Sequence, residues 1–119
     1  MERVVGIGGV FFRAKDAEAL RAWYAEHLGI DVQDWGGAGF EGGVTVWTIF
    51  AGDTEYFGPS GQHSMVNYRV RDLDAMLEQL RAAGVPVDDK VEHSEFGRFG
   101  WATDPEGNRF ELWQPPPES

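Results

Sequence analysis

Two glutamates and two arginines recur at one interval along the chain. Glu55 and Glu111 lie 56 residues apart, and so do Arg13 and Arg69. Two carboxylates in one site can hold a divalent cation through their oxygens, or raise each other's pKa so that one serves as a general base. The arginines could stabilise an oxyanion, or could neutralise the carboxylates in buried ion pairs. The spacing therefore predicts either a chemical site or a set of buried ion pairs with a purely structural role.

The segments that would carry these charges repeat at the same interval. Asp16 and Asp72 each follow a strand-like run and each is a typical N-cap of a helix, which should end at Gly29 and Gly84 respectively. Residues 36–39 are interpreted as a flexible glycine-rich loop. β-branched and aromatic content predicts strands over residues 4–14, 30–35, 44–50, 55–57, 64–70, 87–92, 99–103 and 109–113. The order strand, helix, three strands thus occurs twice.

Alternation along the strands separates two faces. Val10 and Phe12, like Val66 and Tyr68, should face the helices, which leaves the polar set on the inner face. The face taken by Trp47 and Trp101 is not decided by alternation. The candidate ligand-binding residues are Arg13, Trp47, Phe57, Asn67, Arg69, Trp101, Glu111 and Trp113, and the catalytic candidates are Glu55 and Glu111. Rings in strands also form cores, so this set describes either a lined cavity or ordinary packing.

Composition limits the classes of partner. The 119 residues fit one domain, in which we place a first module at about residues 4–58 and a second at about 64–114. A net charge of -10 argues against nucleic acids and anionic membranes, because both require Lys and Arg to neutralise phosphates. Cysteine is absent, and no apolar run is long enough to span a bilayer. We expect a cytoplasmic protein that binds small molecules.

Several motifs resemble one known family. They are the Asp16 and Asp72 strand-to-helix junctions, Trp23-Tyr24 with Leu28-Gly29, and Asp104-Pro105-Glu106-Gly107-Asn108-Arg109-Phe110-Glu111-Leu112. Together they resemble the glyoxalase/bleomycin resistance/extradiol dioxygenase superfamily, the vicinal oxygen chelates, over nearly the whole chain. The resemblance implies an α+β fold in which two tandem βαβββ modules form a cup-shaped sheet.

The same resemblance implies where a metal would bind. In metal-using members the ligands come from the first and last strands of each module, which correspond here to Gly9, Glu55, Met65 and Glu111. Glycine offers no side chain, and a thioether is a soft ligand unsuited to hard divalent ions. We therefore expect no metal cofactor, although Glu55 and Glu111 could hold a divalent ion weakly.

Three functions remain open at this stage. The first is a metal-independent binding protein similar to the drug-binding bleomycin-resistance members, which implies a cationic or aromatic small-molecule ligand and a homodimer. The second is a glyoxalase-like lyase or isomerase that uses Glu55 and Glu111 as metal ligands or as a general base. The third is a scaffold that kept the fold and lost the chemistry. The segment 35–43 could fold over the cavity in several ways.

Overall fold

The structure is a computed structural model that describes residues 1–40, 45–59 and 61–117. In chain order its elements are β1 (Val4–Ala14), α1 (Ala17–Leu28), β2 (Gly37–Phe40), β3 (Thr45–Ala51), β4 (Ser64–Val70), α2 (Leu73–Ala82), β5 (Glu92–Ser94), β6 (Gly97–Thr103) and β7 (Arg109–Gln114). None of the described helices is long and apolar enough to cross a membrane.

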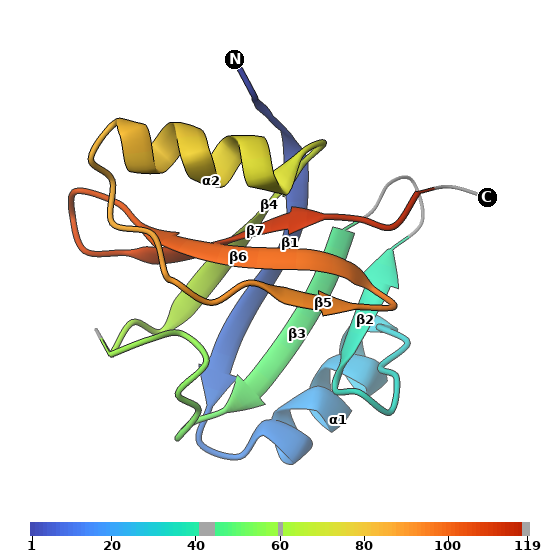
Figure 1. The fold of residues 1–119 in the computed structure, drawn as a ribbon. Coiled ribbons are helices and arrows are strands. Elements are labelled where there is room, and N and C mark those ends of the chain that lie inside the picture. Colours follow the sequence, from blue (N-terminus) through green and yellow to red (C-terminus); the bar gives the residue numbers. More distant parts are fainter. Residues whose placement is uncertain (41–44, 60, 118–119) are drawn as a thin grey trace.

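One curled sheet runs through both halves of the chain. The order of its seven strands is β2-β3-β1-β4-β7-β6-β5 (Figure 1). At the centre β1 pairs antiparallel with β4, and each of these strands pairs in parallel with the last strand of its own half, β3 or β7. The two halves therefore pair within one chain. The predicted α+β fold with its cup-shaped sheet is confirmed.

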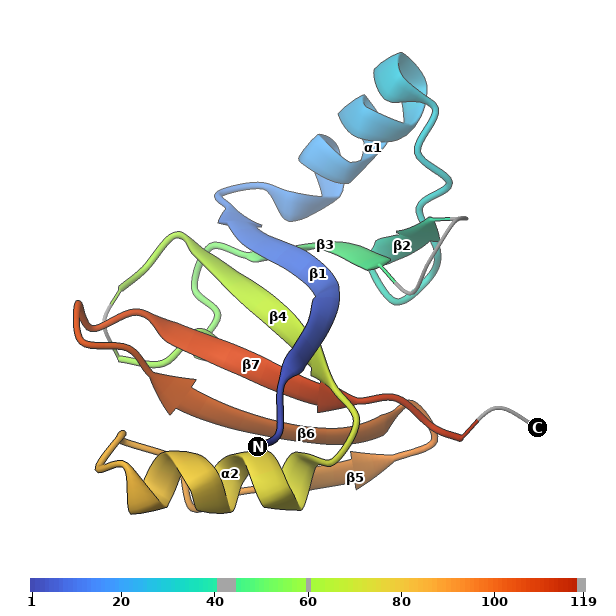
Figure 2. The same ribbon diagram turned by 90° about the horizontal axis from the view of Figure 1, so that it is seen from above.

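The helices lie toward opposite ends of the sheet (Figure 2). Both begin where the sequence predicts, because the Asp16 carboxylate accepts a hydrogen bond from the Ala19 amide at 3.0 Å and the Asp72 carboxylate accepts one from Ala75 at 3.1 Å. Helix α1 ends at Gly29, whose φ of 68° is the left-handed conformation that glycine adopts without strain.

Apolar side chains on the helix-facing side form one core under α2. Leu73, Met76 and Leu77 from the helix pack there against Val70 and Leu112 from the sheet. Helix α1 covers less, since Ala17 is its buried residue. Between the helices the outer face of β1 is left open, and Val4, Ile7 and Val10 are more than 40 % exposed there.

Two predicted strands of the first half are wrong. Residues 30–35 form no strand, and residues 55–57 form a turn in which the Gly58 amide donates to the Glu55 carbonyl at 3.0 Å. The supposed glycine loop is instead β2. A Cβ on Gly37 would lie 2.3 Å from the Trp47 carbonyl oxygen, so glycine is what permits the close approach of β2 to β3.

Two other predicted strands differ from the structure only at their boundaries. Val87 makes an isolated bridge to Ala102, whereas regular pairing in this region begins only at β5, Glu92–Ser94. Residue 44, the first of the predicted strand 44–50, lies outside the described residues, and the remainder matches β3.

The strand register corrects the sequence repeat. Phe11 pairs with Thr48 between β1 and β3, and the matching pair between β4 and β7 is Asn67 with Glu111. The offset of 56 residues thus relates the first strands, but Thr48 and Glu111 are 63 residues apart. The counterpart of Glu111 in the first half is therefore Thr48, because the last strand of that half ends before Glu55.

Candidate functional site

A row of three polar or aromatic side chains crosses the inner face of the second half. Asn67 on β4 pairs with Glu111 on β7, which pairs in turn with Trp101 on β6. Register partners on neighbouring strands point to the same face with their Cβ atoms about 5 Å apart. Pairing alone therefore brings an amide, a carboxyl group and an indole together.

The Glu111 side chain is buried, with 1 % of its surface exposed, and three donors surround it. Asn67 Nδ2 donates to Oε1 at 2.5 Å, and Trp101 Nε1 donates to Oε2 at 3.0 Å. The Tyr56 hydroxyl also donates to Oε2. Buried carboxyl groups require such partners, because a buried polar group without them is destabilising by about 1–3 kcal/mol.

Burial and hydrogen bonding shift the pKa of the Glu111 carboxyl group in opposite directions. Burial disfavours the charged form and raises the pKa of Glu111 above its usual value, while the bonds from Tyr56, Asn67 and Trp101 oppose that shift. Burial, together with the adjacent Glu111 charge, also raises the pKa of Tyr56. Tyr56 therefore remains a hydrogen-bond donor throughout the physiological pH range.

Arg109 contacts two members of this cluster, Trp101 and Tyr56. Its guanidinium lies 5.1 Å above the Trp101 ring and donates to Asp88 Oδ2 at 2.7 Å and to the Tyr56 carbonyl. The side chain is 16 % exposed, so this ion pair is screened less than a surface pair would be. Arg109 thus links the turn that carries Tyr56 to the sheet.

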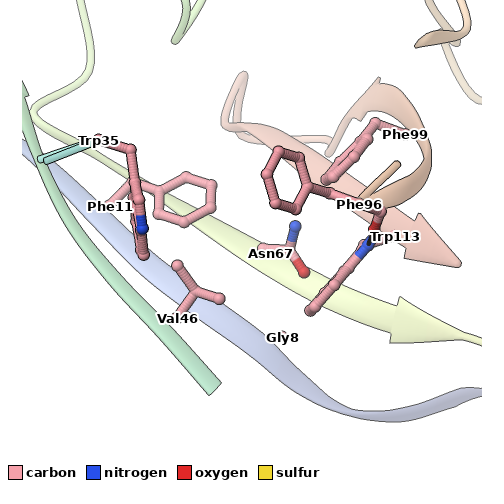
Figure 3. A pocket seen from close by; sticks show the side chains of 8 residues that line it. All are labelled: Gly8, Phe11, Trp35, Val46, Asn67, Phe96, Phe99 and Trp113. Carbon is pink, nitrogen blue, oxygen red and sulfur yellow. Dashed lines mark hydrogen bonds between the residues drawn. The ribbon is translucent and has the colours of Figure 1, made fainter. Parts of the chain in front are cut away.

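A cavity of about 310 Å³ opens on the same inner face. It is lined by Gly8, Phe11, Trp35, Val46, Asn67, Phe96, Phe99 and Trp113 (Figure 3). Phe99 and Trp113 stack with their rings 6.0 Å apart, and Trp113 Nε1 donates to the Phe96 carbonyl at 2.8 Å. Asn67 supplies the amide in an otherwise apolar wall, so the cavity suits a small, largely apolar molecule.

The structure places the predicted ligand-binding residues in several environments. Asn67 and Trp113 line the cavity, whereas Glu111 and Trp101 form the buried cluster behind it. Trp47 faces α1, since it contacts Phe12 and Tyr24. A further pair lies beyond the cavity: Arg13 stacks over the fully buried Phe57, 5.1 Å from its ring centre.

The two remaining candidates lie elsewhere. Arg69 borders a shallow groove with Val5 and Val70. Glu55 is exposed in the turn after β3, so the predicted inner-face pair of Glu55 with Glu111 is wrong. The neighbouring Tyr56 reaches Glu111 from that turn instead.

Sequence reasoning missed most of the cavity wall. Alternation does place Phe11 on the inner face, and continuing it through β6 from Trp101 would have added Phe99. Phe96 lies in a connecting segment to which no strand pattern points, and Trp35 ends the wrongly predicted strand 30–35 and lies in the segment before β2. Only the structure singles them out, as large apolar side chains left exposed, at 64 % for Phe96 and 55 % for Trp35.

The family-type metal positions do not supply a ligand set. Gly9 has no side chain, Met65 is buried among aromatic rings, and the position opposite Glu111 in the first half is Thr48. Glu111 itself already accepts three hydrogen bonds. Within the described ranges no three His, Cys, Asp or Glu side chains come together. These residues do not fit a divalent metal centre.

Comparison with known proteins agrees with this architecture. A model of the Glyoxalase/Bleomycin resistance protein/Dioxygenase superfamily matches residues 6–112. A methylmalonyl-CoA epimerase from Mycobacterium tuberculosis is similar in fold, with a TM-score of 0.71, 24 % identity, and coverage of 96 % of this chain and 90 % of that one.

Two further solved structures are similar to this chain in fold. A Streptomyces coelicolor methylmalonyl-CoA epimerase in complex with 2-nitronate-propionyl-CoA gives a TM-score of 0.68 at 18 % identity, over 92 % of this chain and 96 % of that one. A Mn(II)-bound glyoxalase from Novosphingobium aromaticivorans gives 0.64 at 23 % identity, over 95 % and 40 %. No curated protein matches the sequence.

The raised pKa of Glu111 predicts a pH-dependent difference between the wild type and Glu111→Gln. A carboxyl group whose pKa is higher in the folded protein contributes stability below its unfolded pKa, about 4.3, and loses that contribution as the pH rises through the folded value. Glutamine does not titrate. The free energy of unfolding of the wild type minus that of the variant should therefore fall from pH 4 to pH 8, as measured by urea unfolding. Glu106→Gln, at an exposed site, controls for net charge. A pH-independent difference would contradict this assignment.

The donor set also predicts that divalent metals leave the stability unchanged. Chelator-treated protein should show the same unfolding temperature with and without Mn²⁺, Ni²⁺, Zn²⁺ or Mg²⁺. A site occupied at 100 times its Kd would add about 2.7 kcal/mol. A rise of several degrees that disappears in Glu111→Gln would show that the carboxylate does hold a metal.

Proposed function

The chain belongs to the glyoxalase/bleomycin resistance protein/dioxygenase superfamily, and we propose that it binds a small planar aromatic molecule without a metal ion. In this respect it would act as the drug-binding bleomycin-resistance members that it resembles. The observation that carries the proposal is the aromatic cavity of about 310 Å³. Small-molecule sites commonly measure roughly 300–1,000 Å³ and combine apolar walls with few polar groups.

The cavity offers faces of rings to a flat ligand. Phe11 from β1 and Trp35 from the segment before β2 belong to the first half, while Phe99 and Trp113 belong to the second (Figure 3). Offset or edge-on contacts between aromatic rings contribute about 0.5–1.5 kcal/mol each beyond the burial of apolar area. A planar ligand held between the two halves would contact several of these rings at once.

Charge favours a neutral or cationic ligand over an anionic one. The protein carries a net charge of -10 and so repels anions from a distance. Within the cavity the faces of Trp35 and Trp113 would attract a cation through their π-systems. No arginine or lysine lines the described part of the cavity wall to pair with an anion.

A metal-free isomerase or lyase is the second candidate. Its support is the raised pKa of Glu111, since a general base works best with a pKa near the operating pH. The two methylmalonyl-CoA epimerases share the fold with this chain. However, the oxygens of Glu111 are occupied by three donors, and Asn67 rather than Glu111 lines the cavity. Binding is therefore the function that we favour.

We also propose a homodimer, as the resemblance implies. Strand β1 runs between the two helices (Figure 2). Its Val4, Ile7 and Val10 side chains are 43–46 % exposed. Exposed apolar side chains in a row are typical of protein–protein contact. A second copy would remove this strip from water.

A matched pair of tryptophan variants tests the ligand site. Trp35→Ala removes a cavity ring, whereas Trp23→Ala removes a ring of similar exposure from α1, and both side chains are about half exposed, at 55 % and 48 %. Calorimetric titration with quinoline and with cationic 1-methylquinolinium should show binding to the wild type and to Trp23→Ala. Trp35→Ala should bind about tenfold more weakly, which corresponds to about 1.4 kcal/mol. Equal affinities in both variants would place the ligand elsewhere.

Light scattering after gel filtration tests the dimer. The wild type should elute with twice the monomer mass, and Ile7→Glu should shift it to the monomer, because a charge in the strip cannot be buried without a partner. Val91→Glu, at another exposed apolar position, should leave the mass unchanged. A wild type that is monomeric at high concentration would refute the proposal.

A further inference from the structure

The Arg21 side chain connects helix α1 to two strands of the sheet. Its guanidinium donates through Nε to the Gly36 carbonyl at 3.1 Å and to the Ile49 carbonyl at 3.2 Å, and through Nη2 to Ile49 again. Gly36 directly precedes β2, and Ile49 lies in β3. Hydrogen bonds from a charged donor are stronger than those between neutral groups. One side chain therefore holds α1 against the start of β2 and against β3.

Gly36 closes the turn that carries Trp35. The Gly36 amide donates to the Gln33 carbonyl at 2.9 Å, and the Gln33 amide donates to the Gly37 carbonyl at 2.8 Å. A Cβ on Gly37 would lie 2.3 Å from Trp35 Cζ3, so the indole ring lies against the main chain of Gly37. Trp35 lines the cavity (Figure 3). The position of this ring thus depends on the main chain of two glycines, the first of which accepts the Arg21 hydrogen bond.

Helix α1 packs less closely on the sheet than α2 does. Ala17 is its buried residue, whereas Trp23 is 48 % exposed. Tyr24 adds an edge-on contact with the Trp47 ring at 5.2 Å. A segment with few buried apolar contacts opens locally at a small cost in free energy. The Arg21 hydrogen bonds are therefore a large part of what keeps α1 on the sheet.

We propose that Arg21 couples the position of α1 on the sheet to the position of Trp35 in the cavity wall. This inference rests on the proposed binding function and names a positioning residue and a regulatory element for that same cavity. When α1 detaches, Trp35 loses its support, and the affinity for a ligand falls with the fraction of molecules in which α1 is seated. The coupling is reciprocal, so a bound ligand stabilises the seated helix, although α1 contributes no side chain to the described cavity wall.

A matched pair of arginine variants tests the coupling. Arg21→Met removes the donors and keeps an unbranched side chain. Arg81→Met makes the same change on α2, where Arg81 Nη2 donates to the Asp88 carbonyl at 3.3 Å. Calorimetric titration with quinoline should give an affinity about fivefold lower for Arg21→Met, the lower end of the usual coupling between sites, and an unchanged affinity for Arg81→Met. Arg21→Lys, which lacks the planar fork of the guanidinium, takes the place of Arg21→Met if that variant does not fold.

The effect of Arg21 should pass through Trp35. In a Trp35→Ala background the ring that Arg21 positions is absent, so the addition of Arg21→Met should leave the already weakened affinity unchanged. A purely structural effect of Arg21 would instead weaken binding by the same factor in both backgrounds. This double-mutant cycle therefore separates positioning of the ring from a general loss of stability.

Hydrogen exchange measures the coupling in the reverse direction. Saturating quinoline should slow amide exchange over residues 21–28 of α1 in the wild type by about the same fivefold factor, because the coupling free energy is shared between ligand binding and helix seating. In Arg21→Met, saturating quinoline should leave the exchange of these amides unchanged. General stabilisation by a ligand would slow exchange in both proteins.

The outcomes distinguish the inference from the function beneath it. An unchanged affinity in Arg21→Met, an equal loss of affinity in the Trp35→Ala background, or unprotected α1 amides would each refute the coupling and leave the aromatic cavity as the binding site. Failure of quinoline to bind the wild type at millimolar concentration would refute the proposed function itself, and the inference with it.

Discussion

The burial of one carboxyl group constrains the inner face of this protein. Glu111 lies in the middle of β7 with almost no exposed surface, so its oxygens depend on donors from the protein. Those donors come from a turn, from β4 and from β6, which are far apart in sequence. Satisfying the carboxyl group therefore fixes the turn that carries Tyr56 against the sheet and fixes the Asn67 amide. This arrangement therefore also fixes the Asn67 side chain that lines the cavity.

The aromatic side chains of the inner face pack differently at its two ends. At one end Phe11, Phe57, Met65 and Trp101 pack into a core, and the ring of Tyr56 stacks on Phe50. At the other end the rings of Trp35, Phe99 and Trp113 border open space. Aromatic side chains thus form a core at one end of the inner face and line the cavity at the other. Among the described residues no metal ligand set forms between these ends, so under the proposed function recognition would depend on the ring faces.

Much of the framework was predictable from local sequence signals. The caps Asp16 and Asp72 defined the helices, and alternation placed Phe11 and Asn67 inside, because both signals depend on neighbouring residues only. Long-range register was not predictable. The repeat suggested that Glu55 is the counterpart of Glu111, whereas strand pairing assigns that place to Thr48. The glycines of β2 indicated a loop, although Gly37 permits a close approach to β3 that sequence alone does not reveal.

The chain's five tryptophans provide the most direct test of the aromatic cup as the ligand site. Each indole N–H gives its own signal in a proton–nitrogen NMR spectrum, and the protein can be titrated with quinoline. The signals of Trp35 and Trp113 should shift with ligand concentration, while those of Trp23 and Trp47, which contact Tyr24 on the α1 side, should stay in place. Shifts at Trp23 and Trp47 with none at Trp35 and Trp113 would contradict it.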